Sequence, residues 1–299
     1  DEVFGGYNIF REAKIRRFWA RSPQSDRRAD LIGQLYPYIF NNPRMRRTMR
    51  GFFARGLDQV DDPLYSHQLR WGNTSRLKRF FSDDLKEQIG EYDPYEEITD
   101  SLPKSFAHVD QFARTQYLEM TVFMSNYLLS SQGDRMAMAN SVETRLPYLD
   151  YRVIDLMSRV PAKWKIFGLN EKHLLKRAFK GQLPERITAR AKHPYRAPIR
   201  QGLLDSSAGD YTRDMLSTES VGRAGIFNPD RVDRFIRKCD KDPHFSELDN
   251  MALVGILSSQ LIYRQFIEGF SGKSDVPLCE PTLLVDRRSD RPHRREGRC

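Results

Sequence analysis

The chain has 299 residues, of which 39% are hydrophobic and 30% charged, and a formal net charge of +9. This length suits one large domain or two small ones. The absence of a run of about 18 apolar residues excludes a transmembrane helix, and the basic N-terminus lacks the apolar segment of a signal peptide. The three cysteines are widely spaced and support neither a zinc site nor a disulfide framework, so we expect a cytoplasmic protein.

Apolar residues recur mostly at steps of three and four, and strand signals are weak, so the pattern predicts a mainly helical chain. The first expected helix spans residues 10–21. The second begins at Asn42-Pro43, because Asn is a good N-cap and Pro suits the first helical position. The clearest long helix is predicted over 109–129, and we expect a separate helix over 134–142.

The second half of the chain shows further helix starts. Asp150 is the expected N-cap of a helix that reaches Met157, and Asn170 is the expected N-cap of one that reaches Phe179. Asn228, followed by proline, opens another helix by the same reasoning. A final helix is predicted over 245–270.

Basic residues are concentrated near the start, where residues 1–58 contain twice as many Arg and Lys as Asp and Glu. Such an excess fits either a nucleic-acid surface or solvated helix faces with some residues turned towards nucleotide phosphates. We favour the second interpretation, because no known nucleic-acid module accompanies the charge. Residues 271–299 are rich in Arg, Asp, Ser and Pro and predict a disordered basic tail, with nucleic-acid binding as the alternative.

The chain opens with a carboxylate pair, Asp1-Glu2, followed by Gly5-Gly6 and Tyr7. Carboxylates beside a glycine turn can hold Mg2+, which prefers oxygen ligands and phosphate co-ligands. The simpler interpretation is a frayed terminus that precedes a helix.

A second charged stretch runs from Asp134 to Asp150 and places Arg135, Glu143 and Arg145 among small and apolar residues. Charges in such surroundings are costly to bury unless they are paired. Two interpretations stay open, a buried ion-pair network in which Glu143 pairs with Arg145, and a wall of a phosphate-binding site.

A third stretch follows Leu183-Pro184 and ends in a basic loop interrupted by proline, within which Lys192 stands. A lysine in such a loop can reach a phosphate as a point charge. From composition alone, an exposed lysine without a special role is the alternative.

Together the three stretches, in this order and spacing, resemble the synthetase domain of the glutamine-dependent asparagine synthetase family. Residues 1–7 are similar to the end of the family's Gly-Xaa-Asp-Glu-Val/Leu-Phe-Gly-Gly-Tyr motif, and residues 134–150 to its most recognisable block. Arg190-Xaa-Lys192 is similar to its loop near the reaction centre. The resemblance extends to about residue 270, so we predict one domain over 1–270 and the tail over 271–299.

The resemblance implies a fold class and a reaction. We expect a mainly α fragment, the helical half of an α/β synthetase domain of the ATP-pyrophosphatase type. The family uses ATP and Mg2+ to activate a side-chain carboxylate as an acyl-adenylate, and ammonia derived from glutamine then forms the amide. The expected acceptor is aspartate or a related carboxylate, and a homo-oligomer is expected at full length.

The resemblance also implies roles for particular residues. Asp1 would contact Mg2+–pyrophosphate, with Glu2 and Arg135 as further cofactor-binding residues. The expected catalytic residues are Lys192, which would contact phosphate and later the tetrahedral species, Tyr7 near the acceptor pocket, and Glu119 as an acid facing the site.

The sequence departs from the family pattern in two respects. It contains no Ser-Gly-Gly-Xaa-Asp-Ser loop to cradle the ATP phosphates and no N-terminal cysteine nucleophile for glutamine hydrolysis. We therefore expect a fragment that does not make asparagine by itself. Two rival functions remain, a related amidotransferase that acts on a β-lactam precursor, sugar or peptide, and a basic helical binding module. The expectation on which the family interpretation depends is that Asp1 and Lys192 meet around a magnesium-bound polyphosphate.

Overall fold

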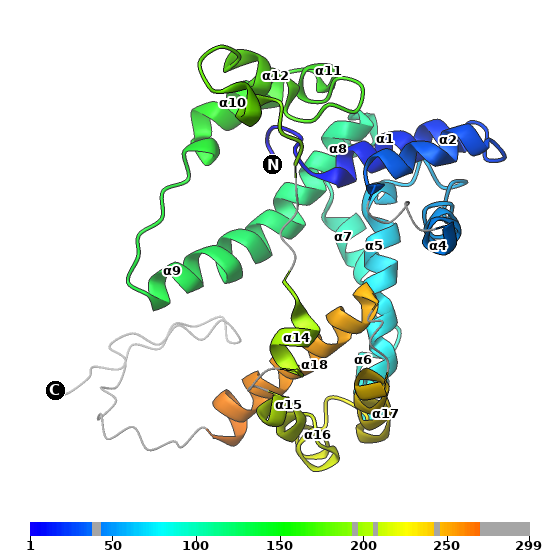
Figure 1. Cartoon of the computed structure of the whole chain (residues 1–299), viewed down its shortest axis with the longest axis vertical. Coiled ribbons are helices and arrows are strands. Elements are labelled where there is room, and N and C mark those ends of the chain that lie inside the picture. Colours follow the sequence, from blue (N-terminus) through cyan, green and yellow to red (C-terminus); the bar gives the residue numbers. More distant parts are fainter. Residues whose placement is uncertain (38–42, 193–196, 206–208, 242–245, 270–299) are drawn as a thin grey trace, which may run out of the picture. The chain divides into compact units, whose positions relative to one another are not determined.

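The computed structural model describes residues 1–37, 43–192, 197–205, 209–241 and 246–269 (Figure 1). Within these ranges the chain is helical and contains no regular strand, so the prediction of a mainly helical chain is confirmed. None of the helices there is both long enough and apolar enough to cross a membrane. The predicted cap Asn42 and the predicted tail over 271–299 lie outside the described residues.

The chain forms two compact units, and the first consists of residues 1–199 together with 246–251. Its α-helices are α1 (Asn8–Ala20), α2 (Asp26–Asp30), α4 (Pro43–Phe53), α5 (Tyr65–Ser75), α6 (Asp83–Ile89), α7 (Pro94–Ser101), α8 (Gln111–Leu118), α9 (Arg135–Ala139), α10 (Tyr151–Arg159), α11 (Ala162–Lys165), α12 (His173–Ala178) and α13 (Glu185–Thr188). Short 3-10 helices cover Leu31–Gln34, Arg76–Phe80, Lys104–His108 and Pro147–Leu149.

Helix α1 lies at the centre of this unit and contacts α2, α5 and α8. Ile15 and Trp19 stand four positions apart and therefore share one face of the helix. Both are buried in an apolar cluster with Phe53 of α4 and Leu69 of α5. Burial of such side chains is worth about 1.5–3 kcal/mol each, which fixes the direction of α1 and of the loop before it.

Some of the basic side chains of α1 are buried inside the fold. Arg16 is only 2% exposed, and its guanidinium donates to the carbonyl oxygens of Phe53, at 3.1 Å, and Arg55, at 2.6 Å, while it covers the ring of Tyr65. Arg11 is also buried. The expectation that the basic residues of this helix line a solvated face is therefore wrong for these two, because carbonyl and carboxylate partners inside the fold satisfy their charge.

The prediction of two separate helices over 109–142 is wrong. α8 continues through a π-helical segment (Glu119–Asp134) into α9, and Asp134 itself has helical backbone angles. Hydroxyl groups of Thr121, Ser125 and Ser130 bond to carbonyl oxygens four residues earlier. This competes with the α-helical ladder and favours the wider hydrogen-bonding pattern. The helix ends at Ala139, and two residues later Ser141 has a φ of +55°.

Two of the predicted caps are confirmed and one is wrong. Asp150 accepts from the amide of Arg152 at the start of α10, and Asn228 accepts from the amide of Arg231 in α17. Asn170 does not cap α12. It forms an isolated bridge with Phe167, and the helix instead begins after a residue in left-handed conformation.

The second unit contains the remaining described residues. Its helices are α14 (Ile199–Leu203), which begins at the boundary, α15 (Gly209–Met215), α16 (Thr218–Ala224), α17 (Pro229–Lys241), the larger part of α18 (Glu247–Tyr263) and a π-helical end (Arg264–Glu268). α16 packs against α15 and α17, with Val221 and Val232 fully buried. The family's predicted site residues all lie in the first unit.

Candidate functional site

The site is built on a tight loop formed by the first seven residues. The amide of Gly6 donates to the carbonyl oxygen of Asp1 at 2.7 Å, which closes the turn before α1. Gly5 has a φ of +68°, a conformation that favours glycine. A Cβ added at Gly6 would overlap Asp1 Oδ1 and the Lys172 side chain. The Gly5-Gly6 pair thus allows the Asp1 carboxylate and the Lys172 side chain to approach the backbone, and the loop is not a frayed end.

Two lysines hold the Asp1 carboxylate from either side. Lys192 Nζ lies 2.8 Å from Oδ2, and Lys172 Nζ lies 2.5 Å from Oδ1, the latter as an ion pair without hydrogen-bond geometry. We call this arrangement of Asp1, Lys172 and Lys192 the carboxylate clasp. The Asp1 side chain is 14% exposed and the lysine side chains are 29% and 23% exposed. The two ammonium groups therefore remain accessible to a ligand at the surface of the clasp.

Glu171, the neighbour of Lys172 in sequence, positions the loop of Lys192. It is 3% exposed, and its Oε1 accepts from the backbone amide of Lys192 at 2.9 Å and from Lys176 Nζ at 3.0 Å. Its Oε2 pairs with Arg11 Nη1 at 3.1 Å. Burial opposes ionisation of Glu171, but the amide hydrogen bonds and the nearby cations Lys176 and Arg11 outweigh it and lower its pKa. Glu171 is therefore an ionised, buried anchor that joins α1 to the loop of Lys192.

Lys172 has an unusual backbone for its residue type, with a φ of +53°. A non-glycine residue in this region costs about 1–3 kcal/mol and is held there by its surroundings. Burial, followed by repulsion from Lys192, lowers the pKa of Lys172. The clasp therefore brings the ammonium groups of Lys172 and Lys192 close together, and Lys172 has a strained backbone.

Tyr7 and Glu2 form the wall next to the clasp. Lys192 Nζ stands 5.6 Å from the centre of the Tyr7 ring, within cation–π range. Burial, then a hydrogen bond with Glu2 and the charges of Glu2 and Glu119, raise the pKa of Tyr7 well above its ordinary value. Tyr7 is therefore a neutral phenol at physiological pH. Glu2 is 7% exposed, and its Oε1 is buried without a hydrogen-bond partner.

Glu119 approaches the same wall from the first turn of the π-helical segment. It is 6% exposed, and its Oε1 lies 3.0 Å from His67 Nε2. His67 Nδ1 lies 2.8 Å from the Ser66 hydroxyl, and the imidazole contacts Trp71. Ser66, His67 and Glu119 thus form one buried chain of hydrogen bonds.

The structure gathers five of the six predicted site residues, namely Asp1, Glu2, Tyr7, Glu119 and Lys192, around one loop of the first unit. Arg135 is not among them. It is exposed at the start of α9, at the end of the long helical segment away from the N-terminus, and its Nη1 contacts Ser131 Oγ at 3.3 Å (Figure 1).

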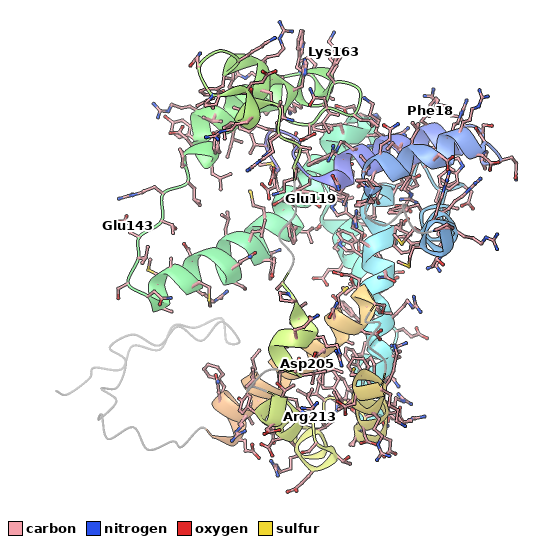
Figure 2. All side chains as sticks on the ribbon, viewed as in Figure 1. Phe18, Glu119, Glu143, Lys163, Asp205 and Arg213 are labelled. Atoms are coloured by element: carbon pink, nitrogen blue, oxygen red, sulfur yellow. The ribbon has the colours of Figure 1, made fainter. Side chains whose placement is uncertain are left out.

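The charged block after α9 does not form a buried network. Glu143 and Arg145 pair at 2.7 Å as predicted, but their side chains are 70% and 83% exposed. Figure 2 places Glu143 on the extended segment after α9, whereas Glu119 lies in the helical segment close to the N-terminal loop. Asp150 pairs with Arg152 at 2.8 Å. An exposed pair of this kind contributes little to stability, so the buried-network interpretation is wrong for these residues.

Four residues that sequence reasoning missed prove central to the geometry: Arg11, His67, Glu171 and Lys172. All four make a contact with a residue between 52 and 171 positions away, and no local pattern encodes such a contact. A glutamate directly before a lysine in a loop was the one available signal, and it is common in any sequence.

Chemically, the loop presents two carboxylates, two accessible ammonium groups and a neutral phenol in one half-buried place. Such a set suits an anionic ligand that approaches through the lysines. No cluster of three or more histidine, cysteine, aspartate or glutamate side chains arranged for a metal ion occurs among the described residues. A metal at this site would thus need ligands from its substrate.

Comparison with known proteins identifies the relatives of this chain. The asparagine synthase family model matches residues 1–264. Asparagine synthetase [glutamine-hydrolyzing] 1 of Bacillus subtilis is 30% identical over 72% of this chain, and a putative asparagine synthetase [glutamine-hydrolyzing] of Mycobacterium bovis is 29% identical over 75%. Amidase chyE of Penicillium rubens is 33% identical over 28% of the chain and 13% of its own length. No solved structure gives a significant match.

The chain spans about a third of the length of the asparagine synthetases it matches, 32% in both cases. The matched region nevertheless contains every residue of the carboxylate clasp and its wall. The chain therefore belongs to the asparagine synthase family, a family of carbon–nitrogen ligases.

Proposed function

We propose that this chain forms the pyrophosphate-facing wall of an ATP-dependent amidoligase that converts a side-chain carboxylate, with aspartate as the first choice, into its amide. One observation carries the proposal: Asp1 is held at 2.5 and 2.8 Å by two lysines that are still accessible. In this proposal the domain is of the α/β ATP-pyrophosphatase type, and the described residues are its helical part.

The lysines act by electrostatics. ATP, when bound, supplies the adenylyl group that turns the acceptor carboxylate into an acyl-adenylate, with pyrophosphate as the leaving group. Fixed ammonium groups placed where this negative charge develops stabilise the transition state without reorganisation of solvent. Lys192 is held through the bond of its amide to Glu171, and Lys172 through its ion pair with Asp1. Lys192, whose side chain reaches both Asp1 and the Tyr7 ring, is the one closest to the acceptor wall.

The carboxylates fit a magnesium ion that arrives with its polyphosphate. Mg2+ typically binds proteins through one or two carboxylates and takes its other ligands from water and phosphate oxygens. Asp1 supplies one carboxylate, and the buried, unpartnered Oε1 of Glu2 supplies a second acceptor. Mg2+ bound there would neutralise part of the phosphate charge.

Tyr7 and Glu119 serve the amide-forming half of the reaction in this proposal. Because its pKa is raised, the Tyr7 phenol keeps its proton and can donate a hydrogen bond to the acceptor without adding negative charge. Ammonia forms the new C–N bond as the bond from the acyl carbon to the adenylate oxygen breaks, and the nitrogen must lose a proton. Glu119, held by His67, accepts that proton. The predicted cofactor-binding role of Arg135 requires that the cofactor also contacts the start of α9.

Binding of magnesium pyrophosphate to the purified chain tests the proposal directly. We expect calorimetric titration to give measurable affinity, and Lys192→Gln and Lys172→Gln each to weaken it at least about tenfold, the loss of one charged hydrogen bond. Lys78→Gln removes an exposed lysine on another element and serves as the matched control. Equal affinity of the Lys192→Gln and Lys78→Gln proteins would contradict the proposal.

The acceptor is tested by catalysis. We expect the 299-residue chain alone to release no pyrophosphate from ATP, Mg2+, aspartate and ammonia above background. In a longer protein that contains this chain, aspartate-dependent exchange between ATP and pyrophosphate would support asparagine formation from glutamine-derived ammonia. Exchange that depends on a β-lactam precursor, sugar or peptide instead would identify a related amidotransferase. Cytoplasmic location and homo-oligomerisation remain predictions.

A further inference from the structure

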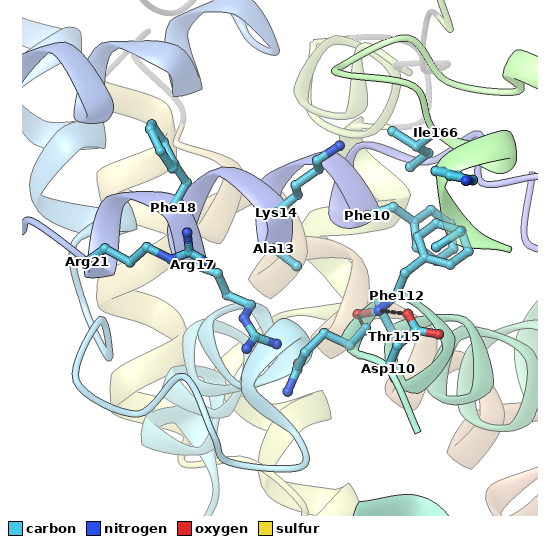
Figure 3. Close-up of a pocket in the computed structure, with 13 residues that line it drawn as sticks. Phe10, Ala13, Lys14, Arg17, Phe18, Arg21, Asp110, Phe112, Thr115 and Ile166 are labelled. Carbon is cyan, nitrogen blue, oxygen red and sulfur yellow. Dashed lines mark hydrogen bonds between the residues drawn. The ribbon is translucent and has the colours of Figure 1, made fainter. Parts of the chain in front are cut away.

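A cavity of about 490 Å3 lies on the side of α1 and shares no residue with the carboxylate clasp or its wall (Figure 3). Its walls come from one face of α1, the start of α8, and α11 with the residue after it. The volume is within the range of about 300–1,000 Å3 that is typical of small-molecule sites. All of these elements belong to the first unit.

The floor of the cavity is apolar. Phe10 and Ile166 are each 3% exposed, and the Phe10 and Phe112 rings pack with their centres 5.0 Å apart. Lys165 also contacts the Phe112 ring, with its Nζ 5.5 Å from the ring centre. Phe18 stands on the rim with 43% of its surface exposed. Together these rings can cover a flat apolar group.

The rim carries an excess of positive charge. Lys14 and Arg17 project from α1, Arg21 is the residue after it, and Lys163 belongs to α11, whereas the one acidic residue of the lining is Asp110. Asp110 Oδ1 is committed to the start of α8, where it accepts from two backbone amides at 2.9 and 3.2 Å. The lining thus has one carboxylate against four cationic side chains.

Arg17 is the cation of the lining that has a donor left unused. Its Nη1 is buried and has no hydrogen-bond partner. Buried donors of this kind are rare in folded proteins, because each forfeits the hydrogen bonds it would make to water. Lys14 differs, since its Nζ already donates to the Gly168 carbonyl oxygen at 2.9 Å. Because Arg17 lines the cavity and is only half-buried, an anionic oxygen bound there can approach its guanidinium.

We propose that this cavity binds a small organic anion that combines a phosphate or carboxylate head with a flat apolar body. The guanidinium of Arg17 binds the head, with Arg21 and Lys163 adding long-range attraction, and the floor of Phe10 and Phe112 binds the body. Guanidinium is suited to this task because its fork of donors matches the oxygens of either head group. The site is independent of the proposed amidoligase function.

Calorimetric titration of the purified chain with four probes tests the proposal. Phenyl phosphate and benzoate carry both head and ring, inorganic phosphate carries only the head, and benzyl alcohol carries only the ring. We expect at least one of the first two to bind at least about tenfold more tightly than either single-feature probe. Comparison of phenyl phosphate with benzoate then identifies the preferred head. Equal weak binding of all four probes would overturn the proposal.

Two variants locate the site. Arg17→Gln should weaken the better probe at least about tenfold, whereas Arg27→Gln, the same change at an exposed position outside the cavity, should leave affinity unchanged. Phe18→Ala removes a rim ring that is not part of the core and should weaken binding of the ring-bearing probes only. Unchanged probe affinity in the Arg17→Gln protein, with helical circular dichroism intact, would refute the assignment.

The same titrations separate this site from the carboxylate clasp. Arg17→Gln should leave magnesium pyrophosphate affinity as it is, and Lys192→Gln should leave phenyl phosphate affinity as it is. If each variant instead abolished both affinities, one common site would explain the data and the cavity assignment would be wrong.

Discussion

Glu171 offers the sharpest test of how the clasp is held together. Its carboxylate is 4% exposed and contacts Arg11, Lys176 and the amide of Lys192 at 2.9–3.1 Å. Glu171→Gln keeps the shape and one carbonyl acceptor but removes the charge, so the buried Arg11 guanidinium loses its counter-ion. Breaking a buried pair costs roughly 3–5 kcal/mol. Lys176 is partly solvated, and the hydrogen bond from the Lys192 amide can be kept by the glutamine oxygen. We therefore expect a loss in the free energy of unfolding at the lower end of this range, about 3 kcal/mol.

Tryptophan fluorescence during urea unfolding is the appropriate assay. All three tryptophans, Trp19, Trp71 and Trp164, belong to the first unit, so their signal reports the unfolding of that unit alone. Glu185→Gln changes an exposed glutamate in α13 and should shift the free energy of unfolding by no more than about 0.5 kcal/mol. A Glu171→Gln protein as stable as the Glu185→Gln protein at pH 7 would refute the reasoning.

The effect should also depend on pH with a definite sign. Because the pKa of folded Glu171 is below the ordinary value of 4.5, the unfolded chain binds more protons at this residue just below that pH. The stabilisation is therefore fully present above pH 4.5 and is lost as pH falls through the folded pKa. The difference in stability between the parent and the Glu171→Gln protein should shrink in that range.

Three further changes probe the loop, its wall and the second unit. Gly6→Ala should weaken magnesium pyrophosphate binding at least about tenfold in calorimetry, because its Cβ would force Asp1 out of the clasp. His67→Ala should lower the free energy of unfolding by about 1–3 kcal/mol in the fluorescence assay, since it leaves Glu119 buried without its partner. Asn228→Ala removes the cap of α17 and should cost about 1 kcal/mol, as measured by circular dichroism.

Each of these changes has its own control or contrary result. Gly51→Ala places a Cβ in open space within α4 and should leave pyrophosphate affinity unaltered, so equal affinities for the Gly6→Ala and Gly51→Ala proteins would speak against the clasp. A His67→Ala protein as stable as the parent would contradict the prediction that Glu119 depends on His67 as its hydrogen-bond partner. A fluorescence transition that moved with Asn228→Ala would contradict the assignment of this cap to the second unit, which holds no tryptophan.

The amino-acid sequence by itself determined the features that depend on short-range contacts. Asp150 and Asn228 were found because an N-cap bonds to an amide two or three residues away, so its residue type and its position suffice. The helical class followed from apolar spacing in the same way. Local signals failed at two places: the predicted break between 129 and 134 is absent because the helix continues through it, and the expected cap Asn170 is replaced by a turn at Lys172.

The tertiary structure alone decided how the site is assembled. The motifs indicated Asp1 and Lys192, but they did not indicate that Lys172 completes the clasp or that Glu171 holds both loops through Arg11. These contacts join residues up to 171 positions apart, and their existence depends on the path of every helix between them. Short-range hydrogen bonds are encoded where they form, whereas an ion pair across the fold exists only once burial has brought its two segments together.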